Sequence, residues 1–217
     1  LAGVCPLYAK YHSYGEYIFD HGWADALERA GGNYYPKLLS AVPFTPATGP
    51  RLMAQSPEAQ RALLQGLAQI AEGSGISSVH VNFVPQSEVE VVKGTDYLVR
   101  HGMQYHWHND DYGSFDEFLA ALNSKKRKAI KKERRQVAET ELKMLRLTGD
   151  DIKPHHWDAF WDFYMDTSDR KWGQAYLTRA FFDQLHETMR DKVLLVMAEE
   201  DGVLVAGALN LIGKDTL

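Results

Sequence analysis

Cysteine and long apolar runs are scarce in this sequence of 217 residues. Its single cysteine, Cys5, excludes an internal disulfide and fits a reducing compartment. No apolar run approaches the roughly 20 residues that span a bilayer. A Gly-x-Ser-x-Gly elbow and a recognisable Cys/His pair are also missing, which argues against a covalent acyl-enzyme. We therefore expect a soluble, cytoplasmic protein without a leader, in which Cys5 is a structural thiol in a buried strand.

Charge is distributed unevenly. The net charge is −5, from 24 basic and 29 acidic residues. One short stretch, opposed only by Glu133, holds a third of the basic residues: Lys125, Lys126, Arg127, Lys128, Lys131, Lys132, Arg134 and Arg135. Outside it, 16 basic residues face 28 acidic ones. The protein is thus acidic with one basic segment, and such asymmetry attracts anionic partners.

Hydrophobic patterning predicts an α/β first half. Strands are expected at 1–10, 34–44, 76–84 and 97–107. Ser56-Pro57-Glu58 starts a helix that Gly73 ends, and the segment 87–93 stays ambiguous. We expect the four strands to share one mixed sheet, with the helix over 57–72 packed on it.

The second half is predicted to add four helices and a second sheet. Ser114-Phe-Asp-Glu117 matches a capping box, and Asn123-Ser124 offers a separate start for a basic helix over 125–136. Further elements are expected as a strand at 141–147, helices from Pro154 and after Thr178, and a hairpin of 192–199 and 203–212 around Asp201-Gly202.

The order strand, turn-rich loop, helix, strand, short helix, strand resembles the acyl-CoA-binding half of a GNAT fold. In that fold the loop before the long helix offers backbone N–H groups to a pyrophosphate. Here Thr48, Gly49 and Arg51 are the candidate cofactor-binding residues. The loop 43–51 lacks the usual Arg/Gln-x-x-Gly-x-Gly/Ala signature and its prolines remove donors. A plain connecting loop is therefore the alternative.

Two pairs of histidines are candidate metal ligands. Alternation would place His106 and His108 on one face, but two ligands without a third at a supporting spacing do not define a site. His155 and His156 stand at a helix start and are expected on the surface. We predict no bound metal.

Three interpretations of the basic segment stay open. A solvated face is the commonest role of a Lys/Arg run, and nucleic-acid binding is the obvious functional one. Residues 125–135 contain no aromatic side chain that could stack on a base. In the third interpretation, Arg127, Lys128 and Lys131 contact an anionic acyl donor or acceptor.

Motifs along nearly the whole chain carry a family resemblance. The segment 115–135 resembles the connector between the two GNAT-like domains of Fem-type peptidoglycan aminoacyltransferases. Other motifs are similar to those of the FemAB-like family of N-acyltransferases: His12-Ser-Tyr-Gly-Glu-Tyr-Ile-Phe-Asp20, Tyr35-Pro-Lys-Leu-Leu39, Pro43-Phe-Thr-Pro46 and Arg170-Lys-Trp-Gly173.

The resemblance implies an α/β (α+β) fold of tandem GNAT-like domains with mixed sheets, both incomplete in this chain. A first domain is expected at 1–113, a basic helical connector at 114–140 and a second domain at 141–217. In a cleft between the domains, Arg170, Lys171 and Trp172 would bind substrate, unless Trp172 lies in the core. We expect the basic helix and Arg170 to form one surface for an anionic ligand, the alternative being an ion pair of Arg170 with Asp166.

The resemblance further implies a bacterial N-acyltransferase. An amine, possibly that of a peptidoglycan precursor, would attack the activated acyl group of acyl-CoA or aminoacyl-tRNA, without a permanently bound cofactor. Such transfer needs a neutral amine and stabilisation of the oxyanion. The acidic candidates for the base, which the sequence does not rank, are Glu16, Asp20, Asp166 and Asp169. The alternatives are a non-catalytic protein that recognises peptidoglycan precursors and a nucleic-acid-binding protein that uses the basic helix, with tRNA as a candidate partner.

Overall fold

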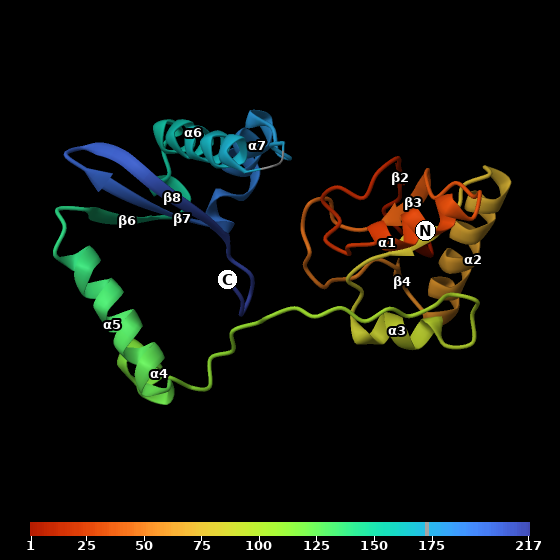
Figure 1. Cartoon of the computed structure of the whole chain (residues 1–217), viewed down its shortest axis with the longest axis horizontal. Helices are drawn as coiled ribbons and strands as arrows, with labels where there is room; N and C mark the ends of the chain where they lie inside the picture. The colour runs from red at the N-terminus through yellow and green to blue at the C-terminus, as the bar shows by residue number, and fades with distance from the viewer. Residues whose placement is uncertain (172–173) are drawn as a thin grey trace. The chain divides into compact units, whose positions relative to one another are not determined.

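The computed structural model describes residues 1–171 and 174–217, so the candidate Trp172 and its neighbour Gly173 lie outside the described residues. The chain divides into two compact units, Leu1–His106 and Trp107–Leu217 (Figure 1). Residues 114–140, the predicted connector, belong to the second unit. No helix in the described ranges is long and apolar enough to cross a membrane.

The first unit contains two small sheets flanked by helices. Its strands are β1 (Gly3–Val4), β2 (Tyr8–Lys10), β3 (Lys37–Ser40), β4 (Met53–Ala54) and β5 (Val79–Val81). Its helices are α1 (His21–Arg29), α2 (Pro57–Gly73) and α3 (Gln86–Val92). One sheet is the antiparallel pair β1–β4, and the other has the order β2-β3-β5, in which β3 pairs antiparallel with β2 and parallel with β5.

The prediction of a single four-stranded sheet is therefore wrong, for two reasons. Pro6 has no N–H to donate and interrupts the segment 1–10, which becomes β1 and β2 in different sheets. The segment 97–107 alternates in sequence but forms no strand, and Leu98 and Tyr105 are each 92% exposed. Cys5 lies between β1 and β2, half-buried, with its Sγ 3.2 Å from Ser40 Oγ. Burial raises the pKa of the Cys5 thiol, as suits a structural rather than a nucleophilic group.

The predicted helix over 57–72 is confirmed as α2. Ser56 caps it, because its hydroxyl accepts a hydrogen bond of 3.2 Å from the Ala59 N–H. Leu64, Leu67 and Ala71 form its buried face. Leu64 packs in a small core with Leu52 and Val91, which fixes one face of the β2-β3-β5 sheet against α2.

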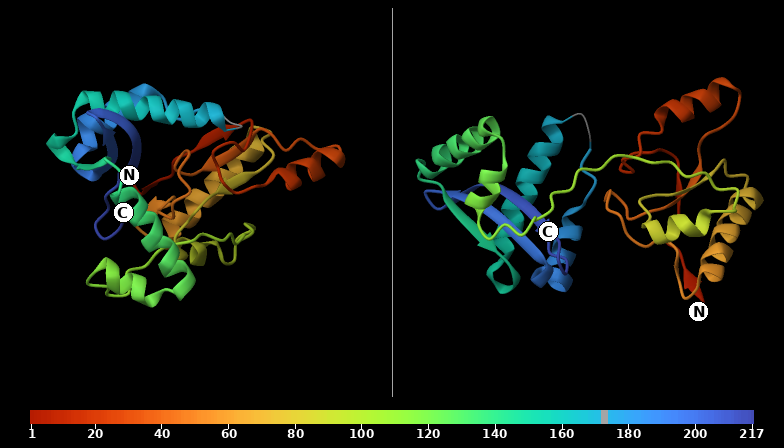
Figure 2. Two further views of the ribbon diagram at one scale, coloured as in Figure 1. Left: turned by 60° about the vertical axis from the view of Figure 1, so that its left-hand side comes forward. Right: turned by 90° about the horizontal axis from the view of Figure 1, so that it is seen from below.

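The second unit has one antiparallel sheet of order β6-β7-β8 (Figure 2). Its strands are β6 (Lys143–Leu147), β7 (Val193–Glu200) and β8 (Val203–Leu211). Its helices are α4 (Phe115–Ala121), α5 (Ser124–Ala138), α6 (Pro154–Arg170) and α7 (Arg179–Met189), with short 3-10 turns at Gly149–Asp151 and Arg190–Lys192. The predicted second sheet and both predicted helix caps are confirmed: Ser114 Oγ accepts from Glu117 N, and Asn123 Oδ1 accepts from Lys126 N.

The core of the second unit lies between this sheet and the pair α6 and α7. Val193, Leu195 and Met197 are fully buried at alternate positions of β7. They pack against Trp157 of α6 and Phe182 of α7, whose ring centroids are 6.0 Å apart. The aromatic side chains of α6 thus form part of the core.

Gly207 of β8 leaves no room for a side chain. A Cβ there would lie 2.9 Å from Met197 Sδ and 3.0 Å from Phe160 Cδ2. We expect Gly207→Val to lower the free energy of unfolding by about 1–3 kcal/mol, the usual cost of overpacking. Ala208, the exposed neighbour of Gly207, supplies the control. Ala208→Val should change the free energy of unfolding by less than about 0.5 kcal/mol. Urea titrations in which both variants unfold at the same midpoint would contradict this packing.

Candidate functional site

The β2-β3-β5 sheet has a polar face opposite α2. Val81 belongs to the core beside α2, so strand alternation turns its neighbour His80 to the other face. His80 is in register with Leu39 of the parallel strand β3, and Lys37 lies two residues before Leu39. The same face of the sheet therefore carries a cation and an imidazole, over which the segment 11–20 and the start of α1 lie.

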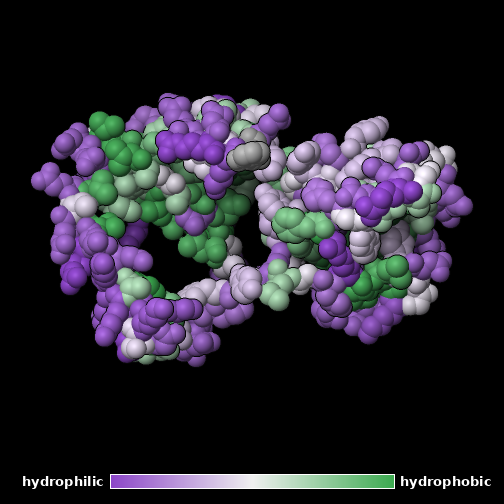
Figure 3. Space-filling view, viewed as in Figure 1, coloured by the Kyte–Doolittle hydropathy of each residue, from purple (hydrophilic) through white to green (hydrophobic). Residues whose placement is uncertain are grey.

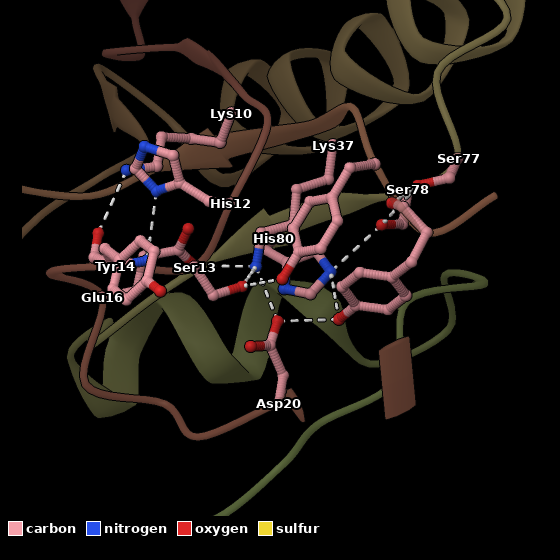
Figure 4. A network of polar contacts seen from close by, with 12 residues as sticks. Lys10, His12, Ser13, Tyr14, Glu16, Asp20, Lys37, Ser77, Ser78 and His80 are labelled. Atoms are coloured by element: carbon pink, nitrogen blue, oxygen red, sulfur yellow. Dashed lines mark hydrogen bonds and ion pairs between the residues drawn. The ribbon is translucent and has the colours of Figure 1, made fainter. Parts of the chain in front are cut away.

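Lys37 is the centre of this face (Figure 4). Its side chain is fully buried, with Nζ 2.6 Å from Asp20 Oδ2 and 2.8 Å from Glu16 Oε2. Nζ also donates a hydrogen bond of 2.7 Å to Ser13 Oγ. A buried ammonium needs such partners, since an isolated charge in the interior costs several kcal/mol.

Tyr34 connects this ion pair to the imidazole. Its hydroxyl donates to Asp20 Oδ2 at 2.7 Å and lies 3.5 Å from His80 Nε2 (Figure 4). Ser78 Oγ is 3.1 Å from the same nitrogen. Because the Tyr34 proton points to Asp20, the phenol presents a lone pair to Nε2, whereas the Ser78 hydroxyl can either donate to this nitrogen or accept from it.

Burial and charge shift the pKa values of these groups in different directions. Burial acts to raise the pKa of Asp20, but hydrogen bonds from Lys37, Ser13 and Tyr34 outweigh it and lower that pKa to about 2. Burial, followed by the positive charge of Lys37, lowers the pKa of His80 to about 4. Burial and the adjacent Asp20 carboxylate raise the pKa of Tyr34. At neutral pH, Asp20 is therefore ionised and the imidazole is neutral.

The charges of the site do not balance. Glu16 and Asp20 are 3% and 1% exposed, and Lys37 is the cation paired with both. Both carboxylate oxygens of Glu16 and Oδ1 of Asp20 are buried without a hydrogen-bond partner, although Glu16 Oε2 forms the ion pair with Lys37. Within the described residues, Glu16, Asp20 and His80 also form a group whose potential ligand atoms all lie within 4.8 Å of one another, as a metal site would require. The arrangement can thus accept a further positive charge.

The segment 11–20 that covers the site has an unusual backbone. Tyr17 and Phe19 adopt φ angles of 57° and 51°, a left-handed conformation that bulky residues rarely take. Such strain costs about 1–3 kcal/mol per residue and clusters at functional sites. Tyr11, Tyr14 and Phe19 are 73%, 66% and 76% exposed, so aromatic rings face solvent above buried carboxylates. This pattern indicates a binding surface rather than a core.

The predicted pyrophosphate loop is held together by its own residues. Arg51 is 2% exposed, and its guanidinium donates to the carbonyl oxygens of Asn82 at 3.0 Å and Ala47 at 2.7 Å. The Gly49 N–H donates to Phe83 O at 3.0 Å, whereas Thr48 is exposed. A phosphate bound here would replace existing hydrogen bonds, and the assignment stays a prediction.

The basic candidates of the second unit are exposed or partly exposed. Arg127 donates to Ala120 O, and Lys131 Nζ is 3.9 Å from Asp116 Oδ1. Lys128 and Lys171 are exposed. Arg170 pairs with Asp166 at 2.9 Å, which is the alternative pairing that the sequence offered. This pair is solvent-exposed, so it contributes little to the stability of the fold. It also leaves Arg170 able to bind an anion.

The predicted surface position of His156 is wrong. His156 is 8% exposed and caps α6, because its Nδ1 accepts a hydrogen bond of 2.9 Å from Lys153 N. His155 is exposed, as expected. His106 Nε2 lies 3.2 Å from Gln104 Oε1, and neither His106 nor His108 belongs to the group of potential metal ligands among the described residues.

The four acidic candidates differ in burial, while the choice of a base among them stays a prediction. Glu16 and Asp20 converge on Lys37, whereas Asp166 and Asp169 are exposed on α6. Sequence reasoning missed Lys37, Tyr34 and His80. One signal for Lys37 was available, because a lysine directly before Leu38-Leu39-Ser40 in a buried strand must find partners.

The lowered pKa of His80 predicts how stability depends on pH. Unfolded chains bind a proton at His80 near pH 6.5, but the folded protein does so only near pH 4. Stability should therefore fall as pH drops through this window, by on the order of 2 kcal/mol after allowance for partial exposure. Chemical denaturation of the wild type and His80→Gln between pH 4 and 7 measures this. In the variant, the free energy of unfolding should depend less steeply on pH, with His156 supplying some of the dependence that remains. Equal pH dependence in the two proteins would show that His80 is not the titrating group.

Comparison with known protein families identifies the family of the whole chain. The FemAB-like family, described as peptidoglycan biosynthesis/recognition, matches residues 1–217. Comparisons with curated proteins and with solved structures found no match. The family match spans the first unit with its buried polar site as well as the whole second unit. The protein therefore belongs to the FemAB-like family of peptidoglycan biosynthesis and recognition.

Proposed function

We propose that the protein is an N-acyltransferase that moves an acyl or aminoacyl group from an activated donor to an amine of a peptidoglycan precursor. The observation that supports this proposal is a neutral imidazole, His80, held beside the buried ion pairs of Lys37 with Glu16 and Asp20. Amide formation needs a group of this kind, because the attacking nitrogen must lose a proton. Family membership supplies the substrate context.

In the proposed reaction, the amine nitrogen attacks the acyl carbon and an N–C bond forms. The C–S bond of a thioester or the C–O bond of an aminoacyl ester then breaks. His80 accepts the proton from the nitrogen as the tetrahedral adduct forms and can return it to the leaving group. An ammonium in that adduct is far more acidic than a free alkylammonium, so an imidazole of low pKa suffices. Tyr34 and Asp20 act as positioning residues that orient the ring.

The donor is proposed to be acyl-CoA or aminoacyl-tRNA, since both carry phosphates that the cations can bind. Candidate contacts are Arg127, Lys128 and Lys131 of α5, with Arg170 and Lys171 at the end of α6. A hollow of about 520 Å³ between α4 and α5, lined by Lys131, Arg134 and Arg135, adds a concave surface of the right charge (Figure 3 shows hydrophilic residues over these helices). A tandem GNAT-like arrangement is part of the same proposal.

A second candidate function is recognition of precursors without catalysis. It is favoured by one observation: the carboxylate oxygens Glu16 Oε1 and Asp20 Oδ1 are covered in this conformation, so chemistry there requires the segment 11–20 to move. If this function is correct, the protein binds a peptidoglycan precursor in an activity assay but transfers no acyl group to it.

The proposed function is tested by incubating the protein with acyl-CoA or aminoacyl-tRNA donors and lysine-containing peptidoglycan precursors. We expect the precursor to gain the mass of the acyl group by mass spectrometry. If precursors bind but gain no mass with any donor of either class, the recognition function replaces the transferase.

A further inference from the structure

We propose that the second unit docks on an anionic phospholipid membrane through a surface of α4 and α5. The cations of α5 lie against the lipid headgroups, and the rings of Trp107 and Phe115 lie at the same level. This inference goes beyond the proposed function and does not depend on it, because it concerns where the protein binds and not which group it transfers. The surface belongs entirely to the unit Trp107–Leu217.

The cations of α5 cover one continuous side of the helix. Successive residues of an α-helix are about 100° apart, so most of the basic side chains fall within an arc of about 180°. Glu133, the one acid of α5, falls outside this arc. Among the described residues, no ion pair involves Lys125, Lys128 or Lys132, so their charge is available to a partner. The members of this basic arc are Lys125, Arg127, Lys128, Lys131, Lys132, Arg134 and Arg135.

Exposed aromatic rings border the basic arc, although the basic segment itself contains none. The guanidinium carbon of Arg134 lies 4.4 Å from the ring centroid of Phe115. The ring of Phe118 connects Phe115 to Trp107, with centroid distances of 5.6 Å and 5.9 Å. Trp107 and Phe115 are nevertheless 65% and 44% exposed. Large apolar rings that stay in solvent beside a cluster of cations indicate an interaction surface.

The cations beside Phe115 are held only weakly by acids of the protein. Phe115, Lys131, Arg134 and Arg135 line the same open hollow. Lys131 Nζ is 3.9 Å from Asp116 Oδ1, and its side chain is 58% exposed. Arg135 Nε is 3.7 Å from Glu139 Oε1, with 70% of the arginine side chain exposed. Such long, wet ion pairs contribute little, so lipid phosphates can replace them.

A lipid surface fits these features better than a nucleic acid does. Single strands stack their bases on free ring faces. Here Arg134 already covers Phe115, and Phe118 contacts Trp107, Tyr112 and Phe115. Rings at a membrane–water interface need no stacking partner, and tryptophan is enriched there. Clusters of Lys and Arg beside such rings are attracted to anionic headgroups.

The test is co-sedimentation of the full chain with lipid vesicles, without any acyl donor. Vesicles of equimolar phosphatidylglycerol and phosphatidylcholine are the probe, and pure phosphatidylcholine vesicles are their neutral match. We expect at least about 10-fold tighter binding to the anionic vesicles, with an affinity that falls as salt is added.

Two double variants test the basic arc. Lys125→Gln with Lys132→Gln removes two cations that are not among the proposed donor contacts, and it should weaken vesicle binding by about 10- to 30-fold. Lys192→Gln with Lys214→Gln removes the same charge from exposed positions elsewhere in the unit. This control should weaken binding by less than about 2-fold, because those lysines lie outside the docking surface.

Tryptophan fluorescence tests the aromatic part of the surface. Binding to the anionic vesicles should shift the emission of the wild type to shorter wavelength, because Trp107 leaves water. Trp107→Phe should remove most of this shift. Trp23→Phe, which changes an exposed tryptophan of the first unit, should keep it.

Four results would overturn the inference. They are equal binding to the two kinds of vesicle, equal binding by the two double variants, a fluorescence shift that persists in Trp107→Phe, and salt-sensitive binding of a polyuridylate oligonucleotide by a protein that does not bind anionic vesicles. The last result would assign the surface to RNA. None of these measurements involves acyl transfer, so the proposed function and the membrane surface can fail separately.

Discussion

Lys37→Met is expected to lower the free energy of unfolding by about 3–5 kcal/mol, because it leaves buried carboxylates without their cation. Glu16 and Asp20 are both almost fully buried, and each depends on Lys37 Nζ for its ion pair. One of them should then bind a proton at neutral pH. The difference in free energy of unfolding between the wild type and Lys37→Met should consequently become smaller as the pH falls.

Two comparisons separate charge from side-chain size in this experiment. Lys93→Met removes an exposed lysine paired with Glu90 and should change stability by less than about 1 kcal/mol. Adding Glu16→Gln and Asp20→Asn to Lys37→Met removes all three charges and should restore much of the loss. Denaturant titration measures each variant. A Lys37→Met protein as stable as Lys93→Met would mean that the cluster is not buried as described.

His80→Gln is expected to reduce the turnover number of acyl transfer by about 10²–10⁴-fold, the usual contribution of a general base. Glutamine keeps a polar side chain near Tyr34 and Ser78 but cannot accept a proton. The fall should appear in kcat at saturating acceptor, since the proposed role of His80 lies in the reaction step. Initial rates of amide formation, scaled to the folded fraction, provide the measurement.

His21→Gln is the matched control for this variant, because His21 is exposed at the start of α1 in the same unit. Its rates should equal those of the wild type. If His80→Gln keeps more than about one-tenth of the wild-type rate, the imidazole is not the proton acceptor.

Local signals predicted much of the fold. The Ser56-Pro57 start of α2, the caps at Ser114 and Asn123, and the Asp201-Gly202 turn depend on neighbouring residues alone, and all are present. The turn has φ angles of 49° and 79°, which an Asp-Gly pair adopts readily. Sheet membership depends on distant partners, which the sequence does not specify, and the alternating segment 97–107 belongs to none of the three sheets.

The site could not be assembled from the sequence, because its residues converge from separate segments. Asp20 was one of four unranked acidic candidates in the sequence, and only the fold shows that its carboxylate binds Lys37. Arg51 reads as a phosphate ligand, but its guanidinium holds the loop carbonyls of Ala47 and Asn82. Composition does not specify in which direction a side chain points.

The most direct test of the central claim is a side-by-side measurement of acyl-transfer rates for Asp20→Asn and Asp169→Asn. Asp20 belongs to the buried cluster of the first unit, whereas Asp169 is exposed on α6 of the second unit. We expect Asp20→Asn to lose at least about 10²-fold in rate, through the misplaced imidazole and the lost charge, and Asp169→Asn to match the wild type. The reverse result, with Asp20→Asn fully active and Asp169→Asn inactive, would contradict a reaction centre at Lys37 and His80.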